Sequence, residues 1–286
     1  MKIIAAPLAG WTDYAFRQVL VRCGAREVWT EMVSATALAR GNQKTIAMLQ
    51  PVKGRVRQVV QLFGNNVDDM RQVILSGMLK DYAEVNLNMG CPAPKIVKNG
   101  CGCKLMTDFD LARAMISQCR AATRQTGQKL SVKCRLGWHE NVAVAFAQMC
   151  ESCGVDRLVV HGRLGVDGYR GHADWEAIAA VKAAVRIPVI ANGDIRDRTS
   201  LRQCLAVTHA DGVMVGRALC GAPWRIKLHD KTPSAKKIRQ LMQFQQKLHQ
   251  GNPHDLTKHF LCYQKHLAKI EHTVYAGDYV TKEDSR

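Results

Sequence analysis

The chain has 286 residues, of which 47% are hydrophobic and 23% are charged. This length suits one large domain, or a large domain with a small one. No apolar run approaches the ~20 residues that a membrane span needs, and the apolar stretch at the N-terminus is too short for a secretory signal. The 11 cysteines are scattered, which favours reduced thiols and a cytoplasmic protein with no membrane contact.

The charge is strongly basic, with 41 Lys and Arg against 24 Asp and Glu and a formal net charge of +17. A basic surface can be no more than a solvated face. An excess of this size also favours a polyanionic partner such as nucleic acid, whose phosphates would contribute much of the affinity.

Short apolar runs alternate with helix-like segments along most of the chain. The runs predict strands at residues 3–6, 28–30, 56–63, 83–87, 130–135, 157–160, 188–191 and 213–215. The segments between them predict helices at residues 13–23, 34–49, 67–79, 108–124, 142–153, 175–185 and 200–207. Eight strands that alternate with helices favour an α/β fold of the (β/α)8 TIM-barrel type.

The alternation of strand-like and helix-like segments ends after Pro223 and Trp224, because no segment that predicts a strand follows. Two helical stretches are expected at residues 235–250 and 255–270, separated by Gly251-Asn252-Pro253. We therefore predict a barrel domain over residues 1–230 and a small all-helical domain with a basic face over residues 231–286. A polar tail is expected from Gly277.

Polar or glycine-rich motifs follow every predicted strand. In (β/α)8 barrels the chemistry lies on these loops, at the carboxyl ends of the strands. The motifs are Pro7-Leu8-Ala9-Gly10, Glu31-Met32, Gln61, Asn88 to Pro92, Lys133 with Arg135, His161-Gly162-Arg163, Asn192-Gly193-Asp194 and Gly216-Arg217.

The last two motifs predict a phosphate site. Loops after the seventh and eighth strands often bind phosphate through backbone N–H groups. Gly193 and Gly216 would let the backbone approach the ligand, and Arg217 can pair with a phosphate in a bidentate manner. Taken singly, each glycine is only a turn.

Four further side chains favour a polar ligand inside the barrel. Lys133 and Arg135 share a face of their strand, and buried cations are costly unless they are paired. They form either a salt bridge or a binding site for an anionic or polar ring, such as a reduced flavin. The Gln61 amide can pair with a heterocycle, and His161 is either a structural histidine or a ligand contact.

Cys91 lies between Gly90 and Pro92, at the end of a buried strand. The thiol can be a core residue, a nucleophile or metal ligand, or a general acid. Its neighbours argue against a core position, and its spacing to Cys101 and Cys103 matches no familiar zinc site, so no metal is expected. A free thiol is mostly protonated at neutral pH and can donate its proton.

At this point the residues resemble a known family. The segment Ala6-Pro7-Leu8-Ala9-Gly10-Trp11-Thr12-Asp13 is similar to the opening signature of tRNA-dihydrouridine synthases. Further matching motifs follow in consistent order at residues 58–64, 86–92, 132–138, 161–163, 169–175, 189–195 and 212–217. The resemblance runs from about residue 4 to 224. The sequence at residues 108–112 and 173–175 is most similar to that of the bacterial B-type subgroup.

The resemblance implies an FMN enzyme, reduced by NADPH or NADH, that converts a uridine of the tRNA D-loop to dihydrouridine. By position Cys91 would protonate C5 of the uracil after hydride transfer to C6. The cofactor would be held by Pro7, Leu8, Ala9, Gln61, Lys133, His161, Asn192, Gly193, Asp194, Gly216 and Arg217. The uracil would be contacted by Asn88, Arg135 and Tyr169. The expected partner is tRNA, and the protein is expected to be a monomer.

Cys101 and Cys103 depart from the family, which usually has Gly or Ala at these positions. The two thiols are inert replacements, redox-sensitive groups or competitors of Cys91 as the proton donor, and we favour the first. Two other functions stay open: an FMN barrel that reduces a small molecule of the dihydroorotate or enoate type, and a non-catalytic RNA-binding barrel.

Overall fold

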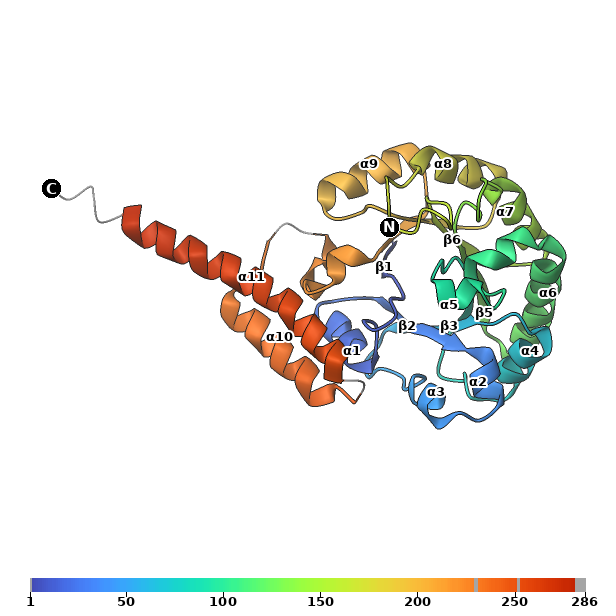
Figure 1. Ribbon diagram of the computed structural model, residues 1–286, viewed down its shortest axis with the longest axis horizontal. Coiled ribbons are helices and arrows are strands. Elements are labelled where there is room, and N and C mark those ends of the chain that lie inside the picture. Colours follow the sequence, from blue (N-terminus) through green and yellow to red (C-terminus); the bar gives the residue numbers. More distant parts are fainter. Residues whose placement is uncertain (1, 229–230, 251–252, 281–286) are drawn as a thin grey trace.

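A computed structural model describes residues 2–228, 231–250 and 253–280 of the chain. Eight parallel strands form one sheet in the order β1-β8-β7-β6-β5-β4-β3-β2, which curves into a nearly closed barrel (Figure 1). The strands are β1 (Lys2–Ala5), β2 (Glu27–Ser34), β3 (Arg57–Phe63), β4 (Glu84–Met89), β5 (Lys129–Cys134), β6 (Arg157–His161), β7 (Val189–Asn192) and β8 (Gly212–Val215). The predicted (β/α)8 barrel is therefore confirmed.

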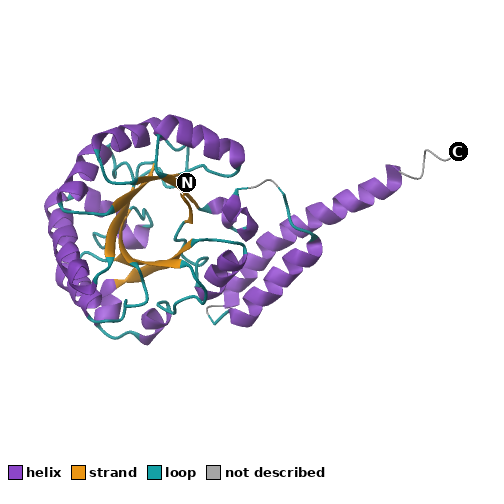
Figure 2. Ribbon diagram, turned by 180° about the vertical axis from the view of Figure 1, so that it is seen from behind, coloured by secondary structure: helices purple, strands orange, loops and turns teal. Residues whose placement is uncertain are grey.

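Helices surround the barrel as an outer ring, which is clearest from behind (Figure 2). The α-helices of this ring are α1 (Tyr14–Arg22), α2 (Ala35–Ala39), α3 (Gln43–Ala47), α4 (Val67–Leu75), α6 (Phe109–Thr126), α7 (Ala143–Ser152), α8 (Trp175–Ala184) and α9 (Arg198–Thr208). Short helices lie in the connections: α5 (Pro94–Val97) and the 3-10 helices η1 (Gly102–Thr107), η2 (Arg217–Leu219) and η3 (Pro223–Lys227).

The single helix predicted for residues 34–49 is wrong, because the chain forms α2 and α3 instead. Gly41 has a φ of 69°, a left-handed conformation that ends a helix. Asn42 then begins α3, since its side-chain oxygen accepts a hydrogen bond from the Thr45 N–H at 3.0 Å. Local capping chemistry overrides the apolar periodicity of the segment.

The core has two layers, one inside the barrel and one between the sheet and the helices. The inner layer is small and includes Ile4, Trp29 and Met214. At the amino ends of the strands the barrel is closed by buried ions, because Arg157 bonds Glu27 at 2.6 Å and Glu84 at 2.8 Å. At the carboxyl ends of the strands the barrel is open and contains a cavity.

Two more helices, α10 (Ala235–Leu248) and α11 (Pro253–Val280), pack beside α1 (Figure 1). An apolar cluster that includes Val19, Trp224, Ile238, Leu241 and Tyr263 joins them to the barrel. Helix α11 runs ten residues past its predicted end, through the start of the expected tail. Residues 281–286 lie outside the described residues. No helix in the described ranges is long and apolar enough to cross a membrane.

Candidate active site

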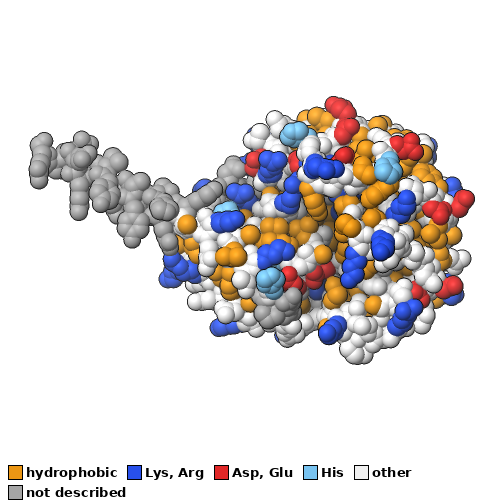
Figure 3. Space-filling model, viewed as in Figure 1, with side chains coloured by type: hydrophobic (Ala, Val, Ile, Leu, Met, Phe, Trp, Pro, Cys, Tyr) orange, Lys and Arg blue, Asp and Glu red, His pale blue; other side chains and the backbone are white. Residues whose placement is uncertain are grey.

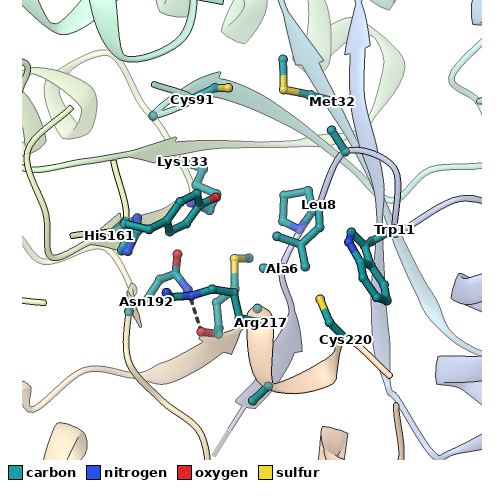
Figure 4. Close-up of a pocket in the computed structure, with 18 of the residues that line it drawn as sticks. Ala6, Leu8, Trp11, Met32, Cys91, Lys133, His161, Asn192, Arg217 and Cys220 are labelled. Carbon is teal, nitrogen blue, oxygen red and sulfur yellow. Dashed lines mark hydrogen bonds between the residues drawn. The ribbon is translucent and has the colours of Figure 1, made fainter. Parts of the chain in front are cut away.

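A cavity of about 660 Å³ opens at the carboxyl ends of the strands. It is the size of a typical small-molecule site. All 15 residues predicted to bind the cofactor or substrate or to donate the proton line it, although they come from seven of the eight strands and the loops that follow them. Figure 4 shows Cys91 on one side of the cavity, with Lys133, His161 and Arg217 around it.

Cys91 sits on a rigid loop directly after β4. The Asn88 side-chain oxygen accepts hydrogen bonds from the N–H groups of Gly90 at 3.2 Å and Cys91 at 2.9 Å. Gly90 packs so closely on the next strand that a Cβ there would lie 3.1 Å from the Cys134 carbonyl carbon. Cys91 is half-buried and lines the cavity. The hydrogen bonds to the Asn88 side chain and the close packing of Gly90 fix the backbone that carries its thiol.

Lys133 brings an unpaired cation to the cavity. Within the described part of the chain, no side chain forms a hydrogen bond or ion pair with its Nζ. Burial lowers the pKa of Lys133 to about 8, and the positive charge of Arg135 lowers it further in the same direction. A half-buried ammonium group without a partner is costly, so this lysine is suited to an anionic ligand.

Arg135, in contrast, is largely committed to the protein. Its Nε donates to the Gly90 carbonyl at 3.0 Å, and its Nη1 donates to the Leu164 carbonyl at 2.7 Å. Arg135 therefore braces the Cys91 loop as well as lining the cavity. The exposed Tyr169 ring is close to two guanidinium groups, with its centre 5.7 Å from that of Arg135 and 5.1 Å from that of Arg217.

His161 is a neutral imidazole in this environment. Burial, followed by the nearby cations beginning with Lys133, lowers the pKa of His161 to about 2. Its Nε2 lies 3.2 Å from Nη1 of the buried Arg163. Because the guanidinium donates, Nε2 is the acceptor, and the proton of the neutral ring is on Nδ1.

Asp194 has its carboxylate turned toward the protein. It accepts from Arg163 at 2.7 Å, from the Ala173 N–H at 2.7 Å and from Arg217 at 3.1 Å. These bonds lower the pKa of Asp194, against the opposing effect of burial. The carboxylate thus orients two arginines, a role that the sequence prediction did not include.

The two glycines of the predicted phosphate loops differ. Gly193 has a φ of 119°, and a Cβ there would lie 2.6 Å from the Ala173 Cβ, so the protein itself requires glycine. At Gly216 a Cβ would lie 3.6 Å from Ala6 and 3.8 Å from Leu8, which is ordinary contact. No close contact with the protein explains the glycine at position 216, and a side chain there would occupy the edge of the cavity.

Cys101 and Cys103 do not line the cavity. Cys103 is fully buried, its thiol donates to the Gly137 carbonyl at 3.3 Å, and burial raises its pKa to about 12. Burial also raises the pKa of Cys101. These placements favour the prediction that both thiols are inert.

Three residues of the site were missed as site residues. Trp11 and Arg163 belong to motifs that the sequence analysis quoted, but a motif does not tell which members point inward. Lys258 was expected on a basic helical face, yet it lines the cavity, with its Nζ 5.5 Å from the centre of the Trp11 ring. No local signal could have placed it there, because α11 is distant in sequence.

Comparison with known proteins gives a consistent result. A probable tRNA-dihydrouridine synthase of Rhodobacter capsulatus is 39% identical over 78% of this chain and 69% of its own. The tRNA-dihydrouridine synthase B of Yersinia pestis is 36% identical, over 78% and 69% of the two chains. Among solved structures, a FabK (M276A) mutant of Thermotoga maritima shares the fold, with a TM-score of 0.50 and 16% identity over 82% of this chain and 65% of that chain. Residues 3–282 match the family described as dihydrouridine synthase, and the chain belongs to this family.

Proposed function

We propose that this protein is a tRNA-dihydrouridine synthase, which reduces the C5=C6 bond of a uridine in the tRNA D-loop. Its reductant is NADPH or NADH, and its cofactor is FMN. The family match and the relatives of that name support the reaction. The proposal rests chiefly on the position of the Cys91 thiol. It lines the same cavity as the unpaired Lys133 and the loop at Gly216, where no protein atom fills the space beside the glycine.

The cavity residues fit a phosphorylated flavin. Lys133 supplies an unpaired cation for the polar edge of the ring, where a reduced flavin carries negative charge. Gly216 leaves space for a phosphate, and Arg217 stands beside it with half of its side chain exposed. Neutral His161 and the Gln61 amide offer hydrogen bonds, and Pro7, Leu8 and Ala9 form an apolar wall.

The chemistry that a bound FMN supplies is the hydride for C6 of the uracil. Cys91 donates its proton to C5, so that one hydride and one proton together saturate the double bond. The thiolate that remains takes a proton from solvent before the next turnover. Asn88 holds the backbone of Cys91, and Arg135 holds that of Gly90, so the donor does not need to be reoriented at each cycle.

The substrate must enter as a flipped base, because the cavity lies inside the barrel rim. Flipping costs a few kcal/mol of stacking, which contacts to the tRNA phosphates must offset. Lys236, Lys237, Lys258 and Lys265 are exposed on α10 and α11. Lys and Arg side chains surround the hollow on this face of the molecule (Figure 3). We assign tRNA binding to residues 231–286 together with the barrel rim.

All 11 cysteines are free thiols, as expected in a reducing compartment. We propose that the protein acts in the cytoplasm, and as a monomer.

The test is dihydrouridine formation from unmodified tRNA transcript with NADPH, measured by nucleoside mass spectrometry. The wild type is expected to form product. Cys91→Ala should retain FMN but lose a factor of about 10² to 10⁴ in turnover, the usual loss when a general acid is removed. Cys101→Ala is the matched control and should keep its turnover.

Two outcomes would overturn parts of this proposal. Full product yield from Cys91→Ala would exclude the thiol as the acid. A flavin-loaded wild type that reduces a uracil-like or enone small molecule, but no tRNA from a synthase-deficient strain, would make the protein a small-molecule reductase.

A further inference from the structure

Five polar side chains form a line through the barrel interior. Glu84, Asn86 and Asn88 alternate along β4, so all three point inward. Gln61 on β3 and Ser131 on β5 flank them at the same level. All five side chains are buried, with no more than 8% of any residue exposed.

These side chains are joined by consecutive hydrogen bonds. The Asn88 amide donates to Gln61 Oε1 at 2.9 Å, and Gln61 donates to Asn86 Oδ1 at 2.8 Å. Asn86 donates to Ser131 Oγ at 2.8 Å, and the Ser131 hydroxyl donates to Glu84 Oε1. The line thus runs from the Cys91 loop to the opposite end of the barrel.

Both ends of the line enforce the same direction. At one end the backbone N–H groups of Gly90 and Cys91 can only donate, so Asn88 must present its oxygen. At the other end the Glu84 carboxylate is paired with Arg157 at 2.8 Å and Arg57 at 2.8 Å, and it can only accept. If any one of the three side-chain amides between these ends were rotated by 180°, its NH2 group would face another donor and its oxygen would face another acceptor.

We propose that Glu84 is a positioning residue for Cys91, acting through Ser131 and the three amides. The inference rests on the proposed function, because it concerns the proton donor of that reaction. The carboxylate fixes the orientation of Asn86, and through it those of Gln61 and Asn88. Buried hydrogen bonds polarise one another along such a chain, so an ion-paired acceptor at its end strengthens each bond. The result is one orientation of the Asn88 oxygen, which holds the Cys91 backbone.

Ser131→Ala tests the line where it can be cut with little change in volume. It leaves Asn86 without its acceptor and removes one of the donors to the Glu84 carboxylate, which keeps its bonds from Arg57 and Arg157. At saturating tRNA we expect single-turnover dihydrouridine formation to slow roughly five- to tenfold, the effect of losing one buried hydrogen bond that orients the acid. The solvent deuterium isotope effect should rise, because proton donation becomes more limiting. Ser131→Thr, which keeps the hydroxyl, should restore most of the rate.

A matched pair of variants separates positioning from stability. Glu84→Gln and Glu27→Gln each weaken an ion pair with Arg157, and both should lower the melting temperature. Only Glu84 touches the line, so only Glu84→Gln should slow the reaction and raise the isotope effect. Equal slowing by Glu27→Gln, or an unchanged rate in Ser131→Ala, would overturn the proposal.

A second measurement needs no dihydrouridine assay. Iodoacetamide alkylation of Cys91, followed by peptide mass spectrometry, reports how the loop presents its thiol. The alkylation rate should change in Ser131→Ala and Glu84→Gln but not in Glu27→Gln. An unchanged rate in all three would contradict the positioning role, whereas a wild type that forms no dihydrouridine but shows this pattern would contradict only the proposed function.

Discussion

His259 of α11 stacks on Trp11 of the barrel, with ring centres 4.2 Å apart and ring planes 12° apart. Its Nε2 donates to the Gly10 carbonyl at 2.8 Å, and its Nδ1 accepts from the Gln245 amide at 2.5 Å. The loop after β1 lines the cavity, so this contact ties the C-terminal helices to one wall of the site.

Replacing His259 should loosen this attachment. We expect His259→Ala to lower the free energy of unfolding by about 1–3 kcal/mol, since a buried hydrogen bond and an aromatic pair are lost. It should also weaken tRNA binding, because Lys258 on the same turn loses its fixed place. Denaturant unfolding and a tRNA titration check this, with the exposed His172→Ala as the control that should change neither.

Acid should destabilise the protein through its buried histidines. The pKa of His161 is lowered to about 2 and that of His259 is also lowered, in both cases chiefly by burial. The unfolded state therefore binds more protons below its histidine pKa of about 6.5. The contribution of these histidines to the free energy of unfolding is fully present above that pH. It falls by up to about 1.4 kcal/mol per pH unit for each histidine as the pH drops toward the pKa values of the folded state. Unfolding titrations between pH 7.5 and 5 should show a shallower slope in His161→Gln.

Lys133 should make flavin binding depend on pH in the alkaline range. With its pKa lowered to about 8, Lys133 loses its charge above that pH, and an anionic ligand then binds less tightly. Anaerobic titration of flavin-free protein with reduced FMN should show an affinity that falls by up to about tenfold per pH unit above pH 8. The Lys133→Met variant should bind FMN weakly, and its affinity should not depend on pH in this range. Lys129→Met, on the exposed end of β5, should behave as wild type.

The two phosphate-loop glycines should respond differently to alanine. Gly193→Ala places a Cβ against Ala173 and His161 in a left-handed conformation, so it should reduce both stability and FMN binding. Gly216→Ala meets only ordinary contacts, so it should cost less stability but still weaken FMN binding. Thermal unfolding of the flavin-free variants and FMN titration would distinguish the two, and equal loss of stability would contradict the assignment.

Cys103 should prove structural. Its buried thiol donates to the Gly137 carbonyl behind the Cys91 loop, and its own N–H donates to the Cys91 carbonyl at 3.0 Å. Cys103→Ala keeps that backbone bond, so we expect turnover within about threefold of wild type and a loss of about 1 kcal/mol of stability. A loss of turnover as large as that of Cys91→Ala would show that Cys103 takes part in proton donation.

Much of the fold and the site could be predicted because both depend on local patterns. Strand and helix alternation is a sequence property, and parallel strands bring their carboxyl ends to one rim whatever the loops contain. Loop residues as far apart as Pro7 and Arg217 could therefore be assigned to one cavity. The break between α2 and α3 was missed because a glycine and an Asn cap outweighed apolar periodicity.

The barrel, the rim that carries the candidate site and the family could all be predicted from the amino-acid sequence, since each depends on residue types at set spacings. The pairings between distant residues could be seen only in the folded chain. They join His259 to Gly10, 249 residues away, Arg163 to Asp194, and Glu84 to the Cys91 loop through Ser131 and three amides. Hydrogen bonds and ion pairs depend on distances of a few ångströms and on direction. Neither quantity is defined until packing brings distant segments together.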